Sequence, residues 1–556
     1  MPPSDHVTHP ALLPRPRSVS WGSGVGARLA DGLALGCEPG AGFEPVARWF
    51  RRQLEAATGW QVGLETSALV PGGAATIELR AGEVAVPGCG PSALGGVEET
   101  YRLEVGGGRV RVTAGAPAGA FYALQTLRQL LPDALYRSAA LPPDPCPPID
   151  VPEAVVEDGP RCRWRGVHLD VARHFMPLPF LLRLVDLAAV HKLNVLHLHL
   201  TDDQGWRVPV PAYPRLIEVG AWRRESPLNH WSEPPQGDGR PHGGFYQRED
   251  LEELVAYAAE RHVTVLPEID MPGHMAAAIA AYPELGNGRR PLEVRTRWGI
   301  SSHVLNLEEE TVRFCEEVLT EVAGIFPGTH LHIGGDECPT KEWEAPENRR
   351  AAQLMAEHSM SSPAELQGWF TARIAGHLRR LGRTLVGWDE ILDAGAPEDA
   401  VVMSWRGEEG GIAAAAAGHD VVMAPQQWLY FDWAYEDSPA EPVAILAATS
   451  LERVYSYDPV ASIPAEHRHH VLGLQAQLWT EYVSTPEHAE YLYFPRLCAS
   501  AEVAWSPPER DFAEFEARLA AHLGRLRAMG VNYRPLSGPT PGQSRVWQGA
   551  EAAPAP

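Results

Sequence analysis

The stretch TVRFCEEVLTEVAGIFPGTHLHIGGDE, residues 311–337, contains a helix and a strand in the order that decides the fold. Apolar residues recur every three to four positions over 311–326, which predicts an amphipathic helix. The short run His330 to Gly335 predicts a buried strand, and its two glycines allow the backbone to turn where it leaves the sheet. Two neighbouring carboxylates, Asp336 and Glu337, stand directly after that turn.

The same alternation of strands and helices extends over most of the chain. The predicted strands are Gly166–Asp170, Val195–Leu200, Val263–Glu268, His330–Gly335, Thr384–Trp388, Val401–Trp405, Asp420–Ala424 and Val471–Gln477. The predicted helices between them are Pro179–Lys192, Arg248–Arg261, Thr311–Phe326, Pro363–Leu381 and Gly411–Ala417. Eight strands that alternate with helices favour a closed (β/α)8 TIM barrel over an open sheet.

The residues before the barrel, 1–152, predict a small α/β (α+β) accessory domain. Its predicted helices and strands are Phe43–Thr58, Ala75–Arg80, Glu99–Val105, Arg109–Ala114 and Ala116–Leu131. The proline-rich segment Leu141–Pro152 is predicted to be an interdomain linker. We expect the barrel at 153–510, a C-terminal helix packed on it at 511–536, and a disordered tail at 537–556, where Gly, Pro, Ser and Ala prevail.

Composition narrows the range of partners. The 556 residues include 71 acidic and 47 basic side chains, a formal charge of -24. This charge argues against binding to nucleic acid or to an anionic membrane and favours a neutral or weakly charged substrate. The seven cysteines are scattered without a CxxC pair, so neither a disulfide framework nor a thiolate zinc site is indicated. No cofactor is expected.

The first twenty residues, MPPSDHVTHPALLPRPRSVS, carry prolines and charges where a secretory signal would carry an apolar stretch. No run elsewhere is long enough to span a bilayer. The sequence as it stands therefore predicts a cytoplasmic protein, with export by a signal outside this sequence as the alternative. It indicates no particular oligomeric state.

Polar and aromatic residues gather after the predicted strands, where the active site of a TIM barrel lies. These segments are Asp170, TDDQGWR (201–207), EIDMPGH (268–274), Asp336–Glu337, WDE (388–390), WR (405–406), WLYFD (428–432) and WTE (479–481). Carboxylates accompanied by tryptophans are typical of carbohydrate sites, because sugar hydroxyls bond to carboxylates and sugar C–H faces stack on indole rings. The pair Asp336 and Glu337 adds acid chemistry, since one anion disfavours the other and tends to keep one carboxyl protonated.

Six segments resemble, in order and spacing, motifs of the family 20 glycoside hydrolases, the β-N-acetylhexosaminidases. They are RWRGVHLDVARHF, HLHLTDDQGWR, PEIDMPGH, HIGGDE, VGWDEIL and LQAQLWTEY. The resemblance covers roughly residues 155 to 510, and the preceding domain is similar to the accessory domain of that family. It implies an exo-acting enzyme that removes a terminal 2-acetamido sugar, N-acetylglucosamine or N-acetylgalactosamine, from a carbohydrate substrate.

The resemblance also implies a mechanism. Glu337 would protonate the glycosidic oxygen and later deprotonate water, while Asp336 would hold the acetamido N–H and stabilise an oxazolinium intermediate, with retention of configuration. A standard retaining pair sits about 5–5.5 Å apart across the sugar. Consecutive side chains on an extended backbone tend to diverge, so we expect Asp336 and Glu337 to be poorly placed for that arrangement.

Further binding roles follow from the matched motifs. Arg165 matches the arginine that binds the hydroxyls on C3 and C4, with a structural salt bridge beneath the barrel as the alternative. Asp202 and His274 match a pair that orients and tunes the acid.

The remaining matches concern the walls of the sugar pocket. Tyr430 would donate to the acetamido carbonyl, and Asp432 and Glu481 would bind the hydroxyls on C4 and C6. The expected pocket walls are Trp369, Trp388 and Trp479, and the tryptophans that either extend the site or only pack are Trp405, Trp428 and Trp433.

Two other classes of protein stay open. The triplets His197-Leu198-His199 and His330-Leu331-His332 suggest a metal-dependent amidohydrolase, because alternate residues of a strand face the same side. Both triplets lie within strands rather than at their ends, and the first strand carries only His168, so no metal is expected. A sugar-binding protein without catalysis would be expected to lose the acid pair, which is intact here. The natural aglycone stays open among chitin fragments, glycan ends and cell-wall fragments.

Overall fold

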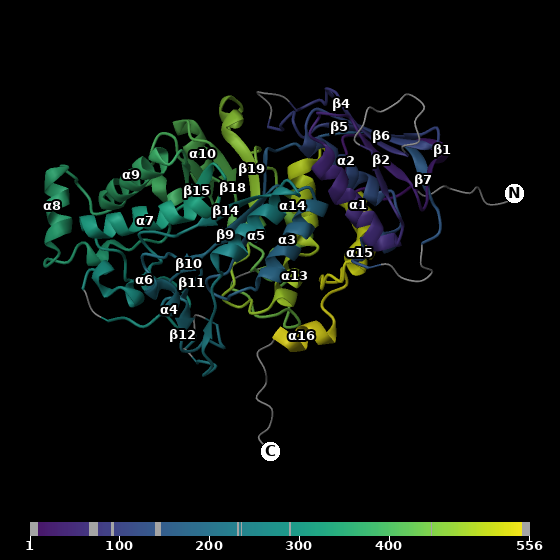
Figure 1. Ribbon diagram of the computed structural model, residues 1–556. Helices are drawn as coiled ribbons and strands as arrows, with labels where there is room; N and C mark the ends of the chain where they lie inside the picture. Colours follow the sequence, from purple (N-terminus) through teal and green to yellow (C-terminus); the bar gives the residue numbers. More distant parts are fainter. Residues whose placement is uncertain are drawn as a thin grey trace, which may run out of the picture.

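The computed structural model describes residues 9–65, 76–89, 94–139, 146–230, 233–234, 236–288, 291–445 and 448–547. Two α/β units make up this part of the chain: a seven-stranded sheet near the N-terminus and a closed eight-stranded barrel after it. Figure 1 shows the first sheet, in purple and blue, beside helices α14 (Arg496–Trp505) and α15 (Phe512–Ala528) of the later chain.

The barrel consists of eight parallel strands, and the predicted TIM barrel is confirmed. Around the barrel the order is β14-β15-β16-β17-β18-β19-β8-β9, and β9 closes the ring by pairing with β14. The strands are β8 (Trp164–Asp170), β9 (Val195–His199), β14 (Thr264–Glu268), β15 (His330–His332), β16 (Thr384–Trp388), β17 (Val401–Ser404), β18 (Val421–Met423) and β19 (Val471–Ala476).

Helices cover the outside of the barrel because each carries one apolar face. In α7 (Glu309–Ile325) the buried residues include Cys315, Val318 and Val322, which repeat at helical spacing. Helix α5 contacts β14, α9 contacts β16, α10 contacts β17 and β18, and α14 contacts β19 and β8. The other barrel helices of eight or more residues are α3 (Leu178–Val190), α5 (Arg248–Ala259), α8 (Arg349–Glu357), α9 (Glu365–Arg380), α10 (Glu409–Ala417), α13 (Pro486–Tyr493) and α14 (Arg496–Trp505).

The accessory domain is a mixed sheet in the order β1-β7-β5-β6-β4-β2-β3. Its strands are β1 (Ser18–Leu29), β2 (Ala34–Cys37), β3 (Gly63–Glu65), β4 (Ile77–Ala81), β5 (Tyr101–Gly106), β6 (Arg109–Ala114) and β7 (Ile149–Asp158). Helices α1 (Glu44–Thr58) and α2 (Pro117–Gln129) accompany the sheet, and α2 packs on β5 and β6. Strand β6 alternates between half-buried and buried residues, as a sheet with one covered face requires.

The boundary between the two units differs from the prediction. Residues 141–145 of the expected linker lie outside the described residues, but Ile149 to Pro152 already belong to β7, which pairs with β1 and β5. The first sheet therefore continues to Asp158. Strand β1 was missed because the first eight residues of its twelve show no buried position and hence no apolar alternation.

The C-terminal region contains two helices. Helix α15 (Phe512–Ala528) packs against the accessory-domain segment Asp133–Tyr136 as well as against α12 (Leu451–Ser456). The predicted disordered tail is wrong for Pro541–Trp547, which forms helix α16. Ser544 Oγ donates to the Ala440 carbonyl at 2.8 Å and so ties this helix to the barrel. Residues 548–556 lie outside the described residues. Among the helices that the structure describes, none is long and apolar enough to cross a membrane.

Buried charges join the accessory domain to the barrel. The Oδ2 atom of Asp158 accepts hydrogen bonds from Tyr101 Oη at 2.8 Å, Lys192 Nζ at 2.9 Å and Trp505 Nε1 at 2.9 Å. Lys192 and Trp505 come from the barrel, whereas Asp158 and Tyr101 come from the first sheet. Two of the three donors to this buried carboxylate come from the barrel, so its hydrogen bonds are complete only while both units stay together, and the units share one interior.

Candidate active site

The turn after β15 brings Asp336 and Glu337 to the C-terminal end of the barrel. Gly334 and Gly335 have φ angles of 66° and 89°, and Glu337 itself has a φ of 46°. A Cβ atom on Gly334 would lie 1.9 Å from Asp270 Oδ1, so only glycine fits there. Asp270 Oδ1 also accepts a hydrogen bond from Gly335 N at 3.1 Å, which holds the turn in place.

Both carboxylates of the pair face one imidazole. His274 Nε2 lies 3.7 Å from Asp336 Oδ2 and 3.5 Å from Glu337 Oε2. The expected divergence of the two side chains is therefore wrong, because the left-handed turn replaces the extended backbone on which it was based. Asp336 is the deeper of the two, with a side chain 12% exposed against 32% for Glu337.

Electrostatics separates the roles of these groups. Burial raises the pKa of Asp336 to about 6, and the charge of His274 opposes that rise. Burial alone would lower the pKa of His274, but the charge of Asp202, 3.3 Å from its Nδ1 atom, raises it well above the usual range. His274 is thus a cation beside the acid pair at neutral pH, and Asp202 is the anion that keeps it so.

An arginine that the sequence analysis did not single out lies next to this group. Arg173 Nη2 is 2.8 Å from Asp202 Oδ2, and its guanidinium carbon lies 5.0 Å from the centre of the Trp479 ring. Asp170 fixes its position by accepting from the Arg173 backbone N–H at 3.1 Å and from its guanidinium at 3.3 Å. Arg173 follows the end of β8, which is where the barrel rule predicts binding residues, so this rule alone could have found it.

Aromatic rings form one wall. The rings of Trp388 and Trp479 have centroids 5.8 Å apart, and the Tyr430 ring is 6.3 Å from that of Trp479. Trp405 stacks on Tyr430 at 6.1 Å, and its Nε1 donates to Glu390 Oε2 at 2.9 Å. Burial raises the pKa of Tyr430 well above its usual range, so its phenol remains a hydrogen-bond donor.

Two more carboxyl groups complete the site, the buried Asp432 and the half-buried Glu481. Burial, together with the charge of Glu481, raises the pKa of Asp432 well above its usual range. Burial also raises the pKa of Glu481, although the charge of Arg173 opposes it. Asp432, Glu481 and Arg173 therefore form a polar group next to the aromatic wall, able to donate and accept hydrogen bonds with a neutral polyol.

Comparison with known proteins shows the family of the chain. Residues 162–508 match the glycosyl hydrolase family 20 catalytic domain, and residues 9–159 match domain 2 of that family. The chain belongs to glycoside hydrolase family 20. A β-hexosaminidase from Porphyromonas gingivalis is 42% identical over 440 residues, covering 78% of this chain and 54% of that protein. The chain thus spans about half the length of that relative.

Solved structures of family 20 proteins share the whole fold. The β-N-acetylhexosaminidase from Streptomyces coelicolor A3(2) superposes with a TM-score of 0.79 at 32% identity, covering 95% of this chain and 98% of that one. The exo β-N-acetylglucosaminidase from Vibrio harveyi, solved with N-acetylglucosamine, has a TM-score of 0.81 at 31% identity, covering 94% and 78% of the two chains. The likeness therefore includes both the barrel and the accessory domain.

The structure contradicts the substrate-binding role predicted for Arg165 in this family 20 protein. Arg165 is the second residue of β8 and lies fully buried at the opposite end of the barrel. Its guanidinium donates to the two Glu99 oxygens at 3.0 and 2.6 Å, to Tyr122 Oη at 3.1 Å and to the Lys192 carbonyl at 2.7 Å. Arg165 therefore forms a structural salt bridge beneath the barrel, which is the alternative interpretation of this residue.

The structure also separates Trp369 from the aromatic wall. Trp369 lies on α9 in the outer ring of helices, with Arg350 and Arg373 at 5.9 and 5.4 Å from its ring and the His358 ring at 6.4 Å. Trp405 takes the expected place instead, since a residue directly after β17 faces the barrel mouth and a helix residue does not.

Trp433 and Trp428 also differ in position: the first lies at the aromatic wall and the second does not. Trp433 packs against the cluster that contains Trp388, Tyr430 and Trp479. Trp428 packs on Tyr457 at 5.4 Å.

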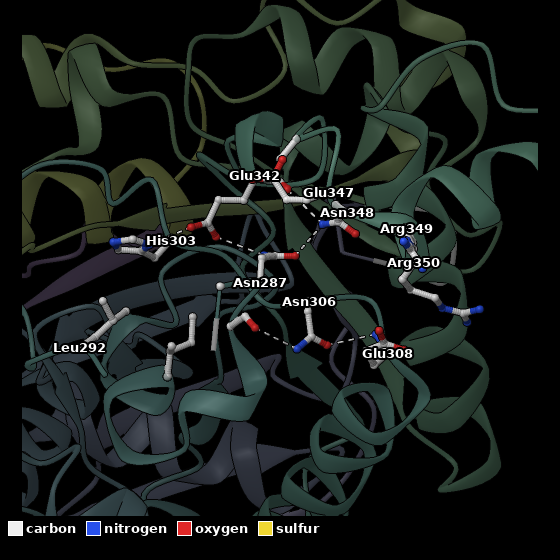
Figure 2. Close-up of a pocket in the computed structure, with 14 residues that line it drawn as sticks. Asn287, Leu292, His303, Asn306, Glu308, Glu342, Glu347, Asn348, Arg349 and Arg350 are labelled. Carbon is white, nitrogen blue, oxygen red and sulfur yellow. Dashed lines mark hydrogen bonds and ion pairs between the residues drawn. The ribbon is translucent and has the colours of Figure 1, made fainter. Parts of the chain in front are cut away.

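A cavity of about 640 Å³ lies between residues 286–308 and the segment 342–350 that follows the acid pair (Figure 2). Its polar side chains bond to one another: Asn287 Nδ2 donates to Glu342 Oε2 at 3.1 Å, and Asn348 Nδ2 donates to Asn287 Oδ1 at 2.9 Å. None of the predicted site residues lines it. This cavity is separate from the site at His274.

The HxH triplets lie inside the barrel, and one histidine from each has a metal-like arrangement with Glu268. Ligand atoms of His197, Glu268 and His332 lie within 4.8 Å of one another. Gln475 Nε2 donates to His197 Nδ1 at 2.9 Å, so His197 carries its proton on Nε2, which lies 3.1 Å from Glu268 Oε2. A protonated nitrogen has no lone pair for a metal, so in this arrangement the imidazole is a hydrogen-bond donor.

Proposed function

We propose that this protein is an exo-acting β-N-acetylhexosaminidase that hydrolyses terminal non-reducing N-acetylglucosamine or N-acetylgalactosamine residues with retention of configuration. The observation that carries the proposal is the pair Asp336 and Glu337, facing one histidine beside a wall of indole rings. Membership of family 20 and its β-hexosaminidase relatives support the same activity.

The reaction is proposed to use the substrate's own 2-acetamido group, as family 20 is an exception to the two-carboxylate mechanism. The acetamido carbonyl oxygen bonds to the anomeric carbon while the bond to the aglycone breaks, and Glu337 gives its proton to the departing oxygen. Water then attacks the anomeric carbon from the face that the aglycone left, the carbon–oxygen bond of the oxazolinium ring breaks, and the water loses its proton to Glu337. Two displacements on one carbon give net retention.

The buried position of Asp336 suits the remaining task. As an anion it accepts the acetamido N–H and stabilises the positive charge of the ring, which is worth more in a buried site than in water. Tyr430 donates to the acetamido oxygen until attack, and Trp388, Trp405 and Trp479 contact the methyl group and the sugar face.

Specificity for a chain end is assigned to the polar group around Arg173. Its guanidinium offers several donors to the sugar hydroxyls, and Asp432 and Glu481 offer acceptors. Arg173 thus takes the role that the sequence analysis had assigned to Arg165. A sugar whose hydroxyls are enclosed by these side chains has no room for a further residue, which favours exo action.

Paired aryl glycosides test substrate assistance. We expect the 2-acetamido glycoside to react at least about 10³-fold faster than the glucoside without the amide, because an intramolecular nucleophile has a high effective concentration. A thiazoline mimic of the cyclised intermediate should inhibit competitively. Equal rates for the two glycosides would refute the mechanism, and a covalent adduct would then be sought on Asp270, Asp432 or Glu481.

The pH profile tests the role of Asp336. Because burial raises its pKa to about 6, kcat should fall as the pH drops through about 6 and Asp336 loses its charge. Asp336→Asn should lower kcat by about 10²-fold or more and abolish this acid limb. Asp399→Asn, which alters an exposed carboxylate, is the matched control and should leave the profile unchanged. An acid limb that persists in Asp336→Asn would show that another group causes it.

A further inference from the structure

A carboxylate–imidazole series, in which the two kinds of side chain alternate, extends from the interior of the barrel to the acid pair. Glu268 Oε2 lies 2.5 Å from His199 Nδ1, and His199 Nε2 lies 3.0 Å from Asp202 Oδ2. Asp202 Oδ1 lies 3.3 Å from His274 Nδ1, whose other nitrogen faces Asp336 and Glu337. His199 is the last residue of the HxH triplet at 197–199, and the hydrolytic reaction has no direct use for that triplet.

The geometry determines the charge of His199. Each of its ring nitrogens faces a carboxylate oxygen, and two ionised carboxylates can only accept, so both nitrogens must donate. Burial alone would lower the pKa of His199, but the charge of Glu268 and the hydrogen bond to Asp202 raise it well above the usual range. His199 is therefore a buried imidazolium held between two anions.

We propose that His199 and Glu268 are positioning residues for the acid/base step, and that the His199 cation keeps Asp202 ionised and oriented toward His274. This inference rests on the proposed function of Glu337 and extends the set of groups that govern it. Asp202 can hold His274 as a cation only while it is an anion itself. His274 in turn fixes the charge that faces Glu337, 3.5 Å away.

Other charged or titratable groups also face the members of the carboxylate–imidazole series. Arg173 contacts Asp202, and Asp203 Oδ2 lies 3.5 Å from His274 Nδ1. Asp270 adds a buried carboxyl at the turn, and Asp170 carries a charge that acts on His199. Glu268 is also faced by His197 at 3.1 Å and His332 at 3.1 Å, and it accepts from Trp388 Nε1 at 2.8 Å.

Two neighbouring histidines, His197 and His168, differ from His199 in their charge. Burial lowers the pKa of His197 to about 4 and that of His168 well below its usual range, so both are neutral at neutral pH. His197 shares the strand and the Glu268 contact of His199 but has no contact with Asp202. His197 therefore provides a matched control, because its replacement removes a buried imidazole but leaves the carboxylate–imidazole series intact.

The test is His199→Gln in the full chain, assayed for kcat and KM against pH with an aryl N-acetylglucosaminide. Loss of a buried positive charge disfavours nearby anions, so the ionisation that ends activity at high pH should become less favourable. We expect kcat to fall about tenfold, KM to change less than twofold, and the alkaline limb to move up by about 1 pH unit. His197→Gln should leave this limb in place.

A second variant gives the opposite sign. Glu268→Gln removes an anion while Asp202 still holds the His199 cation, so the alkaline limb should move to lower pH. A purely structural role predicts lower stability or kcat in both variants without opposed shifts. Unshifted limbs in both variants, or equal shifts in His199→Gln and His197→Gln, would overturn the proposal.

Two measurements on the unaltered protein separate this proposal from the proposed function. Neutron diffraction at pH 8 should place protons on both ring nitrogens of His199, even if neither variant folds, and a single proton would overturn the inference. If the unaltered protein hydrolyses glycosides with and without the acetamido group equally, the proposed function fails instead. If the unaltered protein requires the acetamido group but neither variant shifts the alkaline limb, the proposed function stands. Only the roles of His199 and Glu268 would then be refuted.

Discussion

Replacement of Glu337 by Gln is expected to lower kcat on an N-acetylglucosaminide with a poor leaving group by about 10²–10⁴-fold. The amide nearly keeps the shape of the side chain but cannot give up a proton to the departing oxygen. KM should change little, because Glu337 acts on the bond being broken. Steady-state kinetics over a range of aryl leaving groups measures the loss.

The leaving-group series supplies the internal control for this prediction. A very acidic phenol needs little protonation, so the rate of its departure should fall much less in Glu337→Gln than that of an alkyl alcohol. Glu347→Gln, an exposed residue further along the same loop, should change kcat by less than about twofold. A uniform loss across all leaving groups would assign Glu337 a binding or structural role.

Arg165→Met is expected to lower the free energy of unfolding by about 3–5 kcal/mol, because it leaves the Glu99 carboxylate buried without a partner. Glu99 Oε1 lies 2.6 Å from Arg165 Nη2, and Glu99 belongs to the accessory domain. Equilibrium denaturation with urea measures the change. The folded variant should keep its KM for aryl N-acetylglucosaminides, since Arg165 lies away from the sugar site.

Two further variants frame that result. Arg379→Met breaks an exposed ion pair with Asp399, and it should cost less than about 1 kcal/mol. The double variant Arg165→Met with Glu99→Leu should recover much of the lost stability, because an apolar pair needs no compensating charge. A raised KM in Arg165→Met with unchanged stability would restore the substrate-binding interpretation.

The barrel could be predicted because strand exits carry local signals. Thr384–Trp388 is a strand with the bounds that its apolar run indicated, and Val195–His199 differs by one residue from the prediction. The acid pair, Asp202, His274, Tyr430, Trp388 and Trp479 lie together in the structure because each follows or ends a strand of the same barrel. Strand order and closure then bring distant segments to one end.

The errors have a common origin. Arg165 and Arg173 stand in one motif, and only the direction of β8 through the barrel decides that the first lies at the closed end and the second at the mouth. Trp405 directly follows a strand, whereas Trp369 lies within helix α9, which turns it toward Arg350 and Arg373. Residue type and spacing do not encode which end of an element faces the site.

The sequence alone determined the alternation of elements, the family and the chemical types at the strand ends, because periodicity and motif spacing are local properties of the chain. Only the tertiary structure decided that Asp336 and Glu337 face one histidine, since that depends on three left-handed residues and on Asp270 from the loop after β14. The same holds for the charge of His199. Its two carboxylate partners lie 69 positions and 3 positions away along the chain, and burial between them determines whether it is a cation.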